Sequence, residues 1–185
     1  MKMRRLHVCG FGVAAGLGAL LSGGCTVGDA TEASAPIAGA PAFAPATLRI
    51  HPLTHIEKGP QAGLAAGQCT VVLHLELKDR FGDSVKGLGT LRVELFKPGA
   101  GVSPGIESQA LSWDVNDLAE AEGNSRRFDQ STRTYRIPLV APAWVAEWGK
   151  KDASGASQGY LKLRAVLTTT EGPERYLEDE FVLAG

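Results

Sequence analysis

The sequence predicts an all-β domain, an antiparallel sandwich of about seven strands with one or two short helices. Apolar and polar residues alternate over several segments that follow Thr47, as they do in strands with one buried face. Glycine- and proline-rich turns separate these segments. About 140 residues follow Thr47, which suffices for one core and is too few for two domains. The alternative architecture is an antiparallel β-barrel.

The first residues have the pattern of a secretory targeting segment and are expected to lie outside the fold. Three basic residues come first: Lys2, Arg4 and Arg5. Residues 8–21 follow as an uncharged apolar run, which has the length of a signal-peptide core and is short for a membrane span. The small residues 22–24 then lead to Cys25.

This arrangement resembles the lipobox of bacterial lipoproteins that signal peptidase II processes. The resemblance implies cleavage between Gly24 and Cys25 and attachment of lipid, such as palmitate, to the sulfur and the new amino group of Cys25. The family usually has leucine three residues before the cysteine, where this chain has Ser22, and Leu21 stands one place further back. Secretion after cleavage nearby and an uncleaved anchor are the alternatives.

Cysteine usage fits this interpretation. Cys9 would leave with the signal peptide, and if Cys25 carries lipid, Cys69 is the remaining thiol. A lone cysteine at the start of an apolar strand is expected to be a small buried residue. A Cys25–Cys69 disulfide is the alternative if no lipid is added. A catalytic Cys69 would need exposure and a nearby base.

The charge of the chain argues against nucleic acid as a partner. The full chain has 19 basic and 20 acidic residues, and removal of residues 1–24 leaves 16 basic against 20 acidic residues, a net charge of −4. A mildly acidic surface has no electrostatic reason to bind nucleic acid. It also lacks a polybasic patch for anionic lipid, so the lipid on Cys25 would provide the membrane contact.

The chain is therefore expected to have three parts: a signal peptide at 1–24, the lipidated cysteine with a flexible tether at 25–46, and the sandwich domain at 47–185. Small residues and proline dominate residues 26–46, which cannot bury enough apolar surface to fold. Three prolines favour extended conformations: Pro36, Pro41 and Pro45. The tether is expected to space the domain from the membrane.

The first strand of the domain is expected within residues 47–56, where Leu48 and Ile50 alternate with polar residues. Pro52 interrupts this segment, and since proline cannot donate to a ladder, an edge strand or a bulge is expected. Residues 57–68 are glycine-rich and predict a loop.

Residues 69–96 contain the two clearest strands. Apolar residues recur at every second position from Cys69 to Leu77 and again from Leu91 to Leu95, and the polar alternates predict a wet outer face. The connection contains five residues of a turn pattern: Asp79, Gly82, Val85, Lys86 and Gly87. With both strands it resembles the B-to-C region of bacterial immunoglobulin-like and related extracellular sandwich modules. The resemblance covers about 30 residues and implies an immunoglobulin-like architecture without implying an activity.

The next segments alternate strands with helical turns. Residues 110–115 predict a strand, and residues 116–127 predict one or two helical turns. Asn116 or Asp117 would cap these turns and Gly123 would end them.

A further strand and a helix are expected in residues 128–151. Alternation over residues 135–139 predicts a strand, and Pro138 indicates that it lies at an edge. Pro142 suits a helix start, and Trp144 and Trp148 lie one helical turn apart.

The chain closes with a hairpin of two alternating segments, residues 161–167 and 177–183. Opposite charges on the two strands are expected to help fix the register. Asp179 is an exception to the alternation, because it falls on the apolar side.

Three histidines are candidate metal ligands. His51 and His55 share a strand face but lie about 13 Å apart in an extended chain, too far to share one ion directly. A bend at Pro52 could bring them closer, and His74 would have to supply a third ligand from the adjacent strand. Exposed strand histidines are the simpler interpretation, so no metal site is predicted.

An acidic cluster follows the strand at residues 110–115. Its members are Asp114, Asn116, Asp117, Glu120 and Glu122. Calcium requires several oxygen ligands, but this spacing differs from that of an EF-hand loop. Helix capping and a solvated face explain the cluster, and no cofactor is predicted.

No catalytic residue is predicted. The sequence has no G-x-S-x-G motif, and Ser103 and Ser112 have no local oxyanion signature. It also has no P-loop and no dinucleotide fingerprint. Three tryptophans could line a ligand or carbohydrate surface, although core positions are the simpler interpretation: Trp113, Trp144 and Trp148.

These observations predict a functional class rather than a ligand. The protein is expected to be a membrane-anchored lipoprotein of the bacterial cell envelope that faces the periplasm or the exterior. Its non-catalytic sandwich would bind another envelope protein or a cell-wall polymer, or serve as a structural spacer. The alternative is an enzyme or a metal-dependent ligand binder whose site is built from loops.

Overall fold

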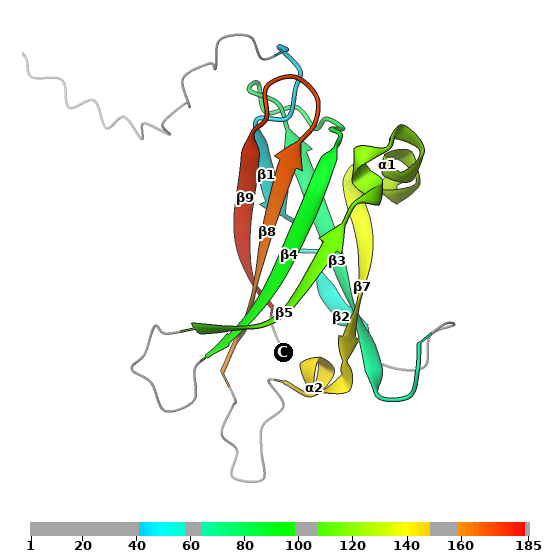
Figure 1. Ribbon diagram of the computed structural model, residues 1–185, viewed down its shortest axis with the longest axis vertical. Helices are drawn as coiled ribbons and strands as arrows, with labels where there is room; N and C mark the ends of the chain where they lie inside the picture. Colours follow the sequence, from blue (N-terminus) through cyan, green and yellow to red (C-terminus); the bar gives the residue numbers. More distant parts are fainter. Residues whose placement is uncertain (1–40, 58–63, 99–106, 149–158, 184–185) are drawn as a thin grey trace, which may run out of the picture. The chain divides into compact units, whose positions relative to one another are not determined.

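The computed structural model describes residues 41–57, 64–98, 107–148 and 159–183. All of them belong to one of the two compact units into which the chain divides, residues 36–185. Within the described residues, nine strands form two open antiparallel sheets (Figure 1). The predicted antiparallel sandwich is therefore confirmed, and the alternative of a closed barrel is wrong. Two strands of three and two residues account for the difference from the predicted seven.

The first sheet contains five strands: β1 (Thr47–Ile50), β2 (His55–Glu57), β3 (Gln68–Lys78), β6 (Phe128–Asp129) and β7 (Thr134–Pro142). Their order is β1-β3-β7-β6, and β2 also pairs with β3. The second sheet contains four strands: β4 (Gly89–Pro98), β5 (Glu107–Val115), β8 (Leu161–Thr169) and β9 (Tyr176–Leu183). Their order is β5-β4-β8-β9. The two orders correspond to A-B-E-D and C′-C-F-G in an immunoglobulin-like sandwich.

Three short helices complete the described structure: η1 (Asp117–Ala119), α1 (Ala121–Arg127) and α2 (Ala143–Glu147). The first two follow β5, and α2 follows β7 directly, with Pro142 at its N-cap position as the sequence predicted. Gly123 lies inside α1, so the prediction that it ends the helical turns is wrong. A Cβ at this position would lie 2.3 Å from the carbonyl oxygen of Asp117, so the close packing of α1 and η1 requires glycine. Asn116 occupies the N-cap position of η1 without a side-chain capping bond.

The connection between β3 and β4 crosses from one sheet to the other. β3 pairs with β1 and β7, whereas β4 pairs with β5 and β8. Asp79 shapes the crossing, because its Oδ1 accepts the backbone N–H groups of Phe81 and Asp83 at 2.8 and 3.0 Å. Gly82 has φ +89°, a conformation that favours glycine. The residues that resemble a B-to-C region therefore lie where such a connection changes sheet.

Inward-facing side chains of both sheets form one apolar core. In β4, β7 and β8, buried residues alternate with more exposed ones, as the sequence predicted. The middle of β3 is buried on both faces, so the predicted wet outer face is wrong there: Thr70, Val72 and His74 are 3%, 0% and 5% exposed. The ring of His55 stacks against that of His74, with centroids 6.3 Å apart, and helps to cover this face.

A buried hydrogen-bond network holds α1 against β7. The hydroxyl of Tyr135 donates to Asn124 Oδ1 at 2.9 Å and accepts the backbone N–H of Gly87 at 3.1 Å. Asn124 Nδ2 donates to the carbonyls of Gly87 and Leu118 at 2.8 and 3.0 Å. Burial raises the pKa of Tyr135, which keeps the hydroxyl protonated as a donor. Because a broken contact here would leave a buried polar group unsatisfied, the network fixes the position of α1.

Ion pairs on the outer face of the second sheet confirm the predicted charge pairing in the closing hairpin. Lys162 Nζ lies 3.1 Å from Glu180 Oε2, and Arg164 pairs with Glu178. Both pairs run diagonally between β8 and β9, because the residue directly opposite Arg164 is Glu180. They are exposed enough that their contribution to stability is small.

Two side chains bridge the sheets, one at each open side of the sandwich. Asp179 of β9 accepts the backbone N–H of Ile50, at the outer edge of β1, at 2.7 Å. On the other side, Trp113 of β5 donates its indole N–H to the carbonyl of Val140 in β7 at 2.8 Å. The carboxylate that breaks the apolar pattern of β9 therefore satisfies an edge N–H in the opposite sheet.

Replacing Asp179 with alanine removes this bridge and leaves the Ile50 N–H without its partner. We expect Asp179→Ala to lower the free energy of unfolding by about 1–3 kcal/mol, the usual cost of an unsatisfied buried donor. Glu180→Ala, on the exposed face of the same strand, is the control and should change this value by less than about 0.5 kcal/mol. Urea unfolding followed by circular dichroism measures both. Equal effects of the two substitutions would contradict the bridging role.

Candidate functional site

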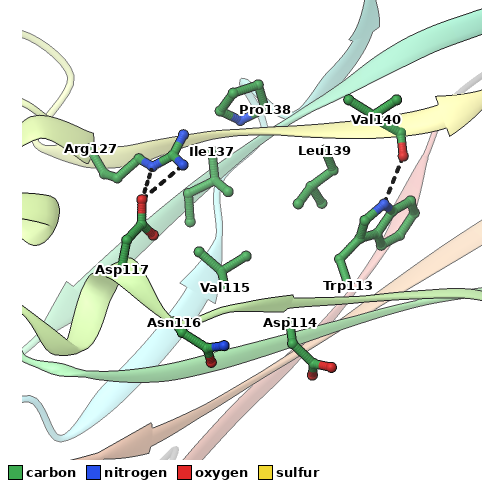
Figure 2. Close-up of a pocket in the computed structure, with 10 residues that line it drawn as sticks. All are labelled: Trp113, Asp114, Val115, Asn116, Asp117, Arg127, Ile137, Pro138, Leu139 and Val140. Atoms are coloured by element: carbon green, nitrogen blue, oxygen red, sulfur yellow. Dashed lines mark hydrogen bonds and ion pairs between the residues drawn. The ribbon is translucent and has the colours of Figure 1, made fainter.

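A groove lies on the side of the sandwich where β5 faces β7 (Figure 2). It arises because β6 begins only at Phe128, opposite Tyr135, so the outer edge of β7 from Arg136 onward has no neighbouring strand within the described residues. The groove has a volume of about 420 Å³. This size falls within the range of small-molecule and side-chain binding sites.

Apolar side chains from the core form the floor of the groove. Val115 comes from β5, and Ile137 and Leu139 come from β7 and point toward it (Figure 2). Their exposed fractions are only 9%, 1% and 3%, so they are core residues reached at the bottom of the groove. A ligand that fills the groove would therefore contact the apolar interior of the sandwich.

Polar contacts bound the groove at its two ends. At one end the indole of Trp113 holds the carbonyl of Val140, whose own side chain is 49% exposed. At the other end Nε and Nη2 of Arg127 both lie 2.9 Å from Oδ2 of Asp117. The second oxygen of Asp117, Oδ1, is buried and has no hydrogen-bond partner among the described residues. The groove thus combines an apolar floor with an arginine–carboxylate pair that closes this end.

The structure brings part of the predicted acidic cluster to this groove. Asp114, Asn116 and Asp117 all line it, whereas Glu120 and Glu122 do not. Two of the carboxylates face arginines: Asp114 lies 3.8 Å from Arg92, and Asp117 is held by Arg127. Within the described part of the chain, no group of three or more His, Cys, Asp or Glu side chains is arranged to hold a metal ion.

The three histidines gather on the outer face of the first sheet, because the chain turns after β1. His51 Nδ1 accepts the N–H of Leu53 at 3.2 Å, and His55 Nδ1 lies 2.7 Å from the carbonyl oxygen of Leu53. His74 Nδ1 lies 3.0 Å from the hydroxyl of Thr134. His74 is buried, so the prediction of an exposed histidine is wrong at this position.

The surroundings of His74 disfavour its charged form. Burial is the main cause that lowers its pKa from the ordinary value of 6.5. The positive charges of Arg136, His55 and His51 act in the same direction, and Asp129 acts in the opposite one. The folded protein therefore takes up a proton at His74 less readily than the unfolded chain.

Cys69 is the small buried residue that the sequence predicted. It is 1% exposed, and its Sγ donates to the carbonyl of Pro142 at 3.3 Å. Burial raises the pKa of the thiol, which keeps it protonated and a poor nucleophile.

The tryptophans lie at the margins of the core rather than at its centre. Trp144 and Trp148 pack edge to face, with ring centroids 5.7 Å apart, and Lys97 Nζ lies 5.6 Å from the Trp144 ring. Both are partly buried against the core, as is Trp113 beside the groove. Ser112, the other described candidate nucleophile, is exposed on β5, and Ser103 lies outside the described residues.

The β7 side of the groove was not identified from the sequence. Its residues are Ile137, Pro138, Leu139 and Val140. The one sequence signal was Pro138, which predicted an edge strand but gave no indication of the strand across the gap.

Comparisons of the chain with protein-family models, with curated proteins and with solved structures gave no match. None of the described helices is long and apolar enough to cross a membrane. The function is therefore argued from the sequence pattern and from the groove.

The lowered pKa of His74 predicts a loss of stability in acid. In the unfolded chain His74 has its ordinary pKa of 6.5 and takes up a proton below that pH. The stability that neutral His74 contributes to the folded protein should therefore be complete above pH 6.5 and should fall as the pH drops below it. At pH 5.5 the loss is at most about 1.4 kcal/mol. His74→Gln retains a hydrogen-bonding group for Thr134 and cannot be charged, so it should remove this component.

Unfolding free energies of the two proteins at pH 7.5 and pH 5.5 provide the measurement. The decrease between the two pH values should be smaller in the variant. An equal decrease in both proteins would show that His74 does not contribute.

Proposed function

We propose that this chain is a lipid-anchored protein of the bacterial cell envelope whose β-sandwich is a non-catalytic binding module. The module would bind another envelope component through the groove between β5 and β7. The observation that carries the binding role is the short β6, which leaves core residues of the sandwich reachable from outside. A groove of this kind exposes apolar surface, and such surface on a folded domain usually serves a contact.

The anchor is supported by the order of segments at the start of the chain. A basic start, an apolar run at residues 8–21 and small residues before Cys25 resemble the signal of a lipoprotein, although Ser22 stands where the lipobox usually has leucine. Residues 26–40 would then link the lipid to the domain, which the chain enters at residues 41–46. Phe43 and Phe81 lie near this entry, 71% and 61% exposed, with ring centroids 6.1 Å apart. An exposed aromatic pair suits a domain that is held beside a membrane.

The chemistry of the groove favours binding over bond cleavage. Its floor is apolar, and the carboxylates of Asp114 and Asp117 face arginines instead of a free reaction space. A charged pair at the rim of an apolar groove typically orients a ligand and excludes wrong partners.

Replacing Cys25 with alanine tests the anchor. We expect the wild-type protein to fractionate with membranes and to carry the added mass of its acyl chains, since two or more chains give stable anchoring. Cys25→Ala should abolish both the added mass and the membrane retention. Intact-mass analysis of membrane and soluble fractions measures this. Unchanged mass and membrane retention in the variant would refute lipidation at this residue.

Replacing Val140 with arginine tests the groove. Val140 lies at the rim of the groove, with its side chain on the exposed face of β7, so arginine here should hinder entry of a ligand without disturbing the core. We expect capture of the bound component from detergent-solubilised envelope to fall by about tenfold, equivalent to about 1.4 kcal/mol of binding free energy. Val182→Arg is the matched control, since Val182 is 54% exposed on β9 at the other side of the sandwich. Equal capture by both variants would contradict a binding role for the groove.

A further inference from the structure

Of the sheet edges at β1, β5, β7 and β9, three are protected against pairing with another chain. At β1 the free N–H of Ile50 is occupied by Asp179 of the other sheet. β9 carries acidic residues at three consecutive positions, 178–180. At β7, Pro138 and Pro142 lack an N–H, and Trp113 occupies the carbonyl of Val140. Prolines, charges and covering side chains are the usual means of preventing strand addition.

β5 is less protected than these edges. Its acidic residues lie near its two ends, at Glu107 and Asp114, and its register with β4 shifts between Gln109 and Leu111. It is the outer strand of the second sheet (Figure 1), and its nine residues include neither proline nor lysine. Within the described residues no strand pairs with its outer side. An edge strand of this length is a template for pairing with an extended chain.

The ladder register identifies which backbone groups of β5 are free. The N–H of Thr170 donates to the carbonyl of Leu88 at 3.0 Å, so in β4 the even-numbered residues point their backbone groups toward β8. The odd-numbered residues therefore point toward β5, where Val93 faces Trp113. It follows that the N–H and C=O groups of Ser112 and Asp114 point away from the sheet.

The groove lies beside this free edge. An extended segment added to β5 would turn every second side chain inward, over Ile137 and Leu139. It would turn the other side chains outward, next to Asp114, whose side chain is 65% exposed. Backbone groups at the edge would supply affinity, and the groove would select the side chains.

We propose that the groove is occupied by an extended segment of another envelope protein, which adds as a strand to the outer edge of β5 and places alternate apolar side chains in the groove. This proposal rests on the binding role proposed above and names the ligand class. Asp114 lies 3.8 Å from Arg92 but its side chain stays 65% exposed, so it can also attract a lysine or arginine of the segment. The chain after residue 24, with 16 basic and 20 acidic residues, likewise favours a basic partner. The same acidic balance disfavours a second copy of this chain as the occupant.

Substitution of Ser112 by proline tests the backbone contact in the full-length, membrane-bound protein. The Ser112 N–H points away from β4, so Ser112→Pro removes a free donor and leaves the ladder with β4 intact. Ser112→Ala keeps the N–H and is the matched control. A photoreactive benzoylphenylalanine at Asn116, on the rim of the groove, reports the occupant by cross-linking in cells.

We expect a cross-link to a second polypeptide that falls by about tenfold with Ser112→Pro and is unchanged with Ser112→Ala, as loss of an edge hydrogen bond and its register predicts. Mass spectrometry of the adduct should identify a segment with alternate apolar residues and a flanking basic residue. That segment, made as a synthetic peptide, should bind the purified full-length protein. A copy with N-methyl groups on the backbone nitrogens that face β5 should lose binding by about tenfold or more.

The methylated peptide keeps the test decisive if Ser112→Pro fails to fold, because it removes the same contacts from the ligand side. A cross-link to a glycan, or to a polypeptide that binds Ser112→Pro and wild type alike, overturns strand addition. If Val140→Arg still abolishes binding in that case, the binding role of the groove stands without it. A cross-linked adduct with twice the mass of this chain would show that the occupant is a second copy, and it would overturn the proposed partner. No groove-dependent cross-link at all overturns both proposals.

Discussion

The free backbone groups at the edges of the two sheets impose the constraint on which this structure depends. Both sheets are open, so their outer strands carry N–H and C=O groups that no neighbouring strand satisfies. Asp179 satisfies Ile50 at one side, and Trp113 satisfies Val140 at the other. Each of these bonds joins one sheet to the other. The contacts that shield the edges therefore also hold the two sheets at a fixed position around the apolar core.

The groove depends on the packing at one of these sides. Tyr135 and Asn124 hold α1 against β7, and α1 ends at Arg127, whose pair with Asp117 bounds the groove. After α1 the chain forms only the two residues of β6, and the turn at 130–133 then leads into β7. Because the buried network fixes where α1 ends, it also fixes how little of β7 is covered by β6. A structural network thus determines where the core can be reached from outside.

Strands could be predicted from the sequence because burial of one strand face depends on alternation within the strand itself. Contacts between segments that lie far apart in the chain are much harder to predict from the sequence. Asp179 stood out as a polar residue on an apolar face, but its partner Ile50 lies 129 positions away. The burial of His74 depends on the ring of His55 in β2, which local pattern does not reveal. The acidic cluster did point to one wall of the groove, through Asp117, whereas Pro138 was recognised only as the mark of an edge.

The different treatment of the edges is the strongest argument that β5 has a partner. An exposed edge strand is a hazard for any folded protein, and the edges at β7, β9 and β1 are blocked by prolines, by three consecutive acidic residues and by a bridging carboxylate. Pro138 lacks a backbone N–H, so it protects the free edge of β7 against pairing with another chain. Of the two strands that border the groove, β5 is therefore the one that can pair with an extended segment. If Cys25 carries lipid as proposed, the domain is confined near a membrane, where other anchored proteins are concentrated. Under those conditions even a moderate affinity is enough for the edge to be covered.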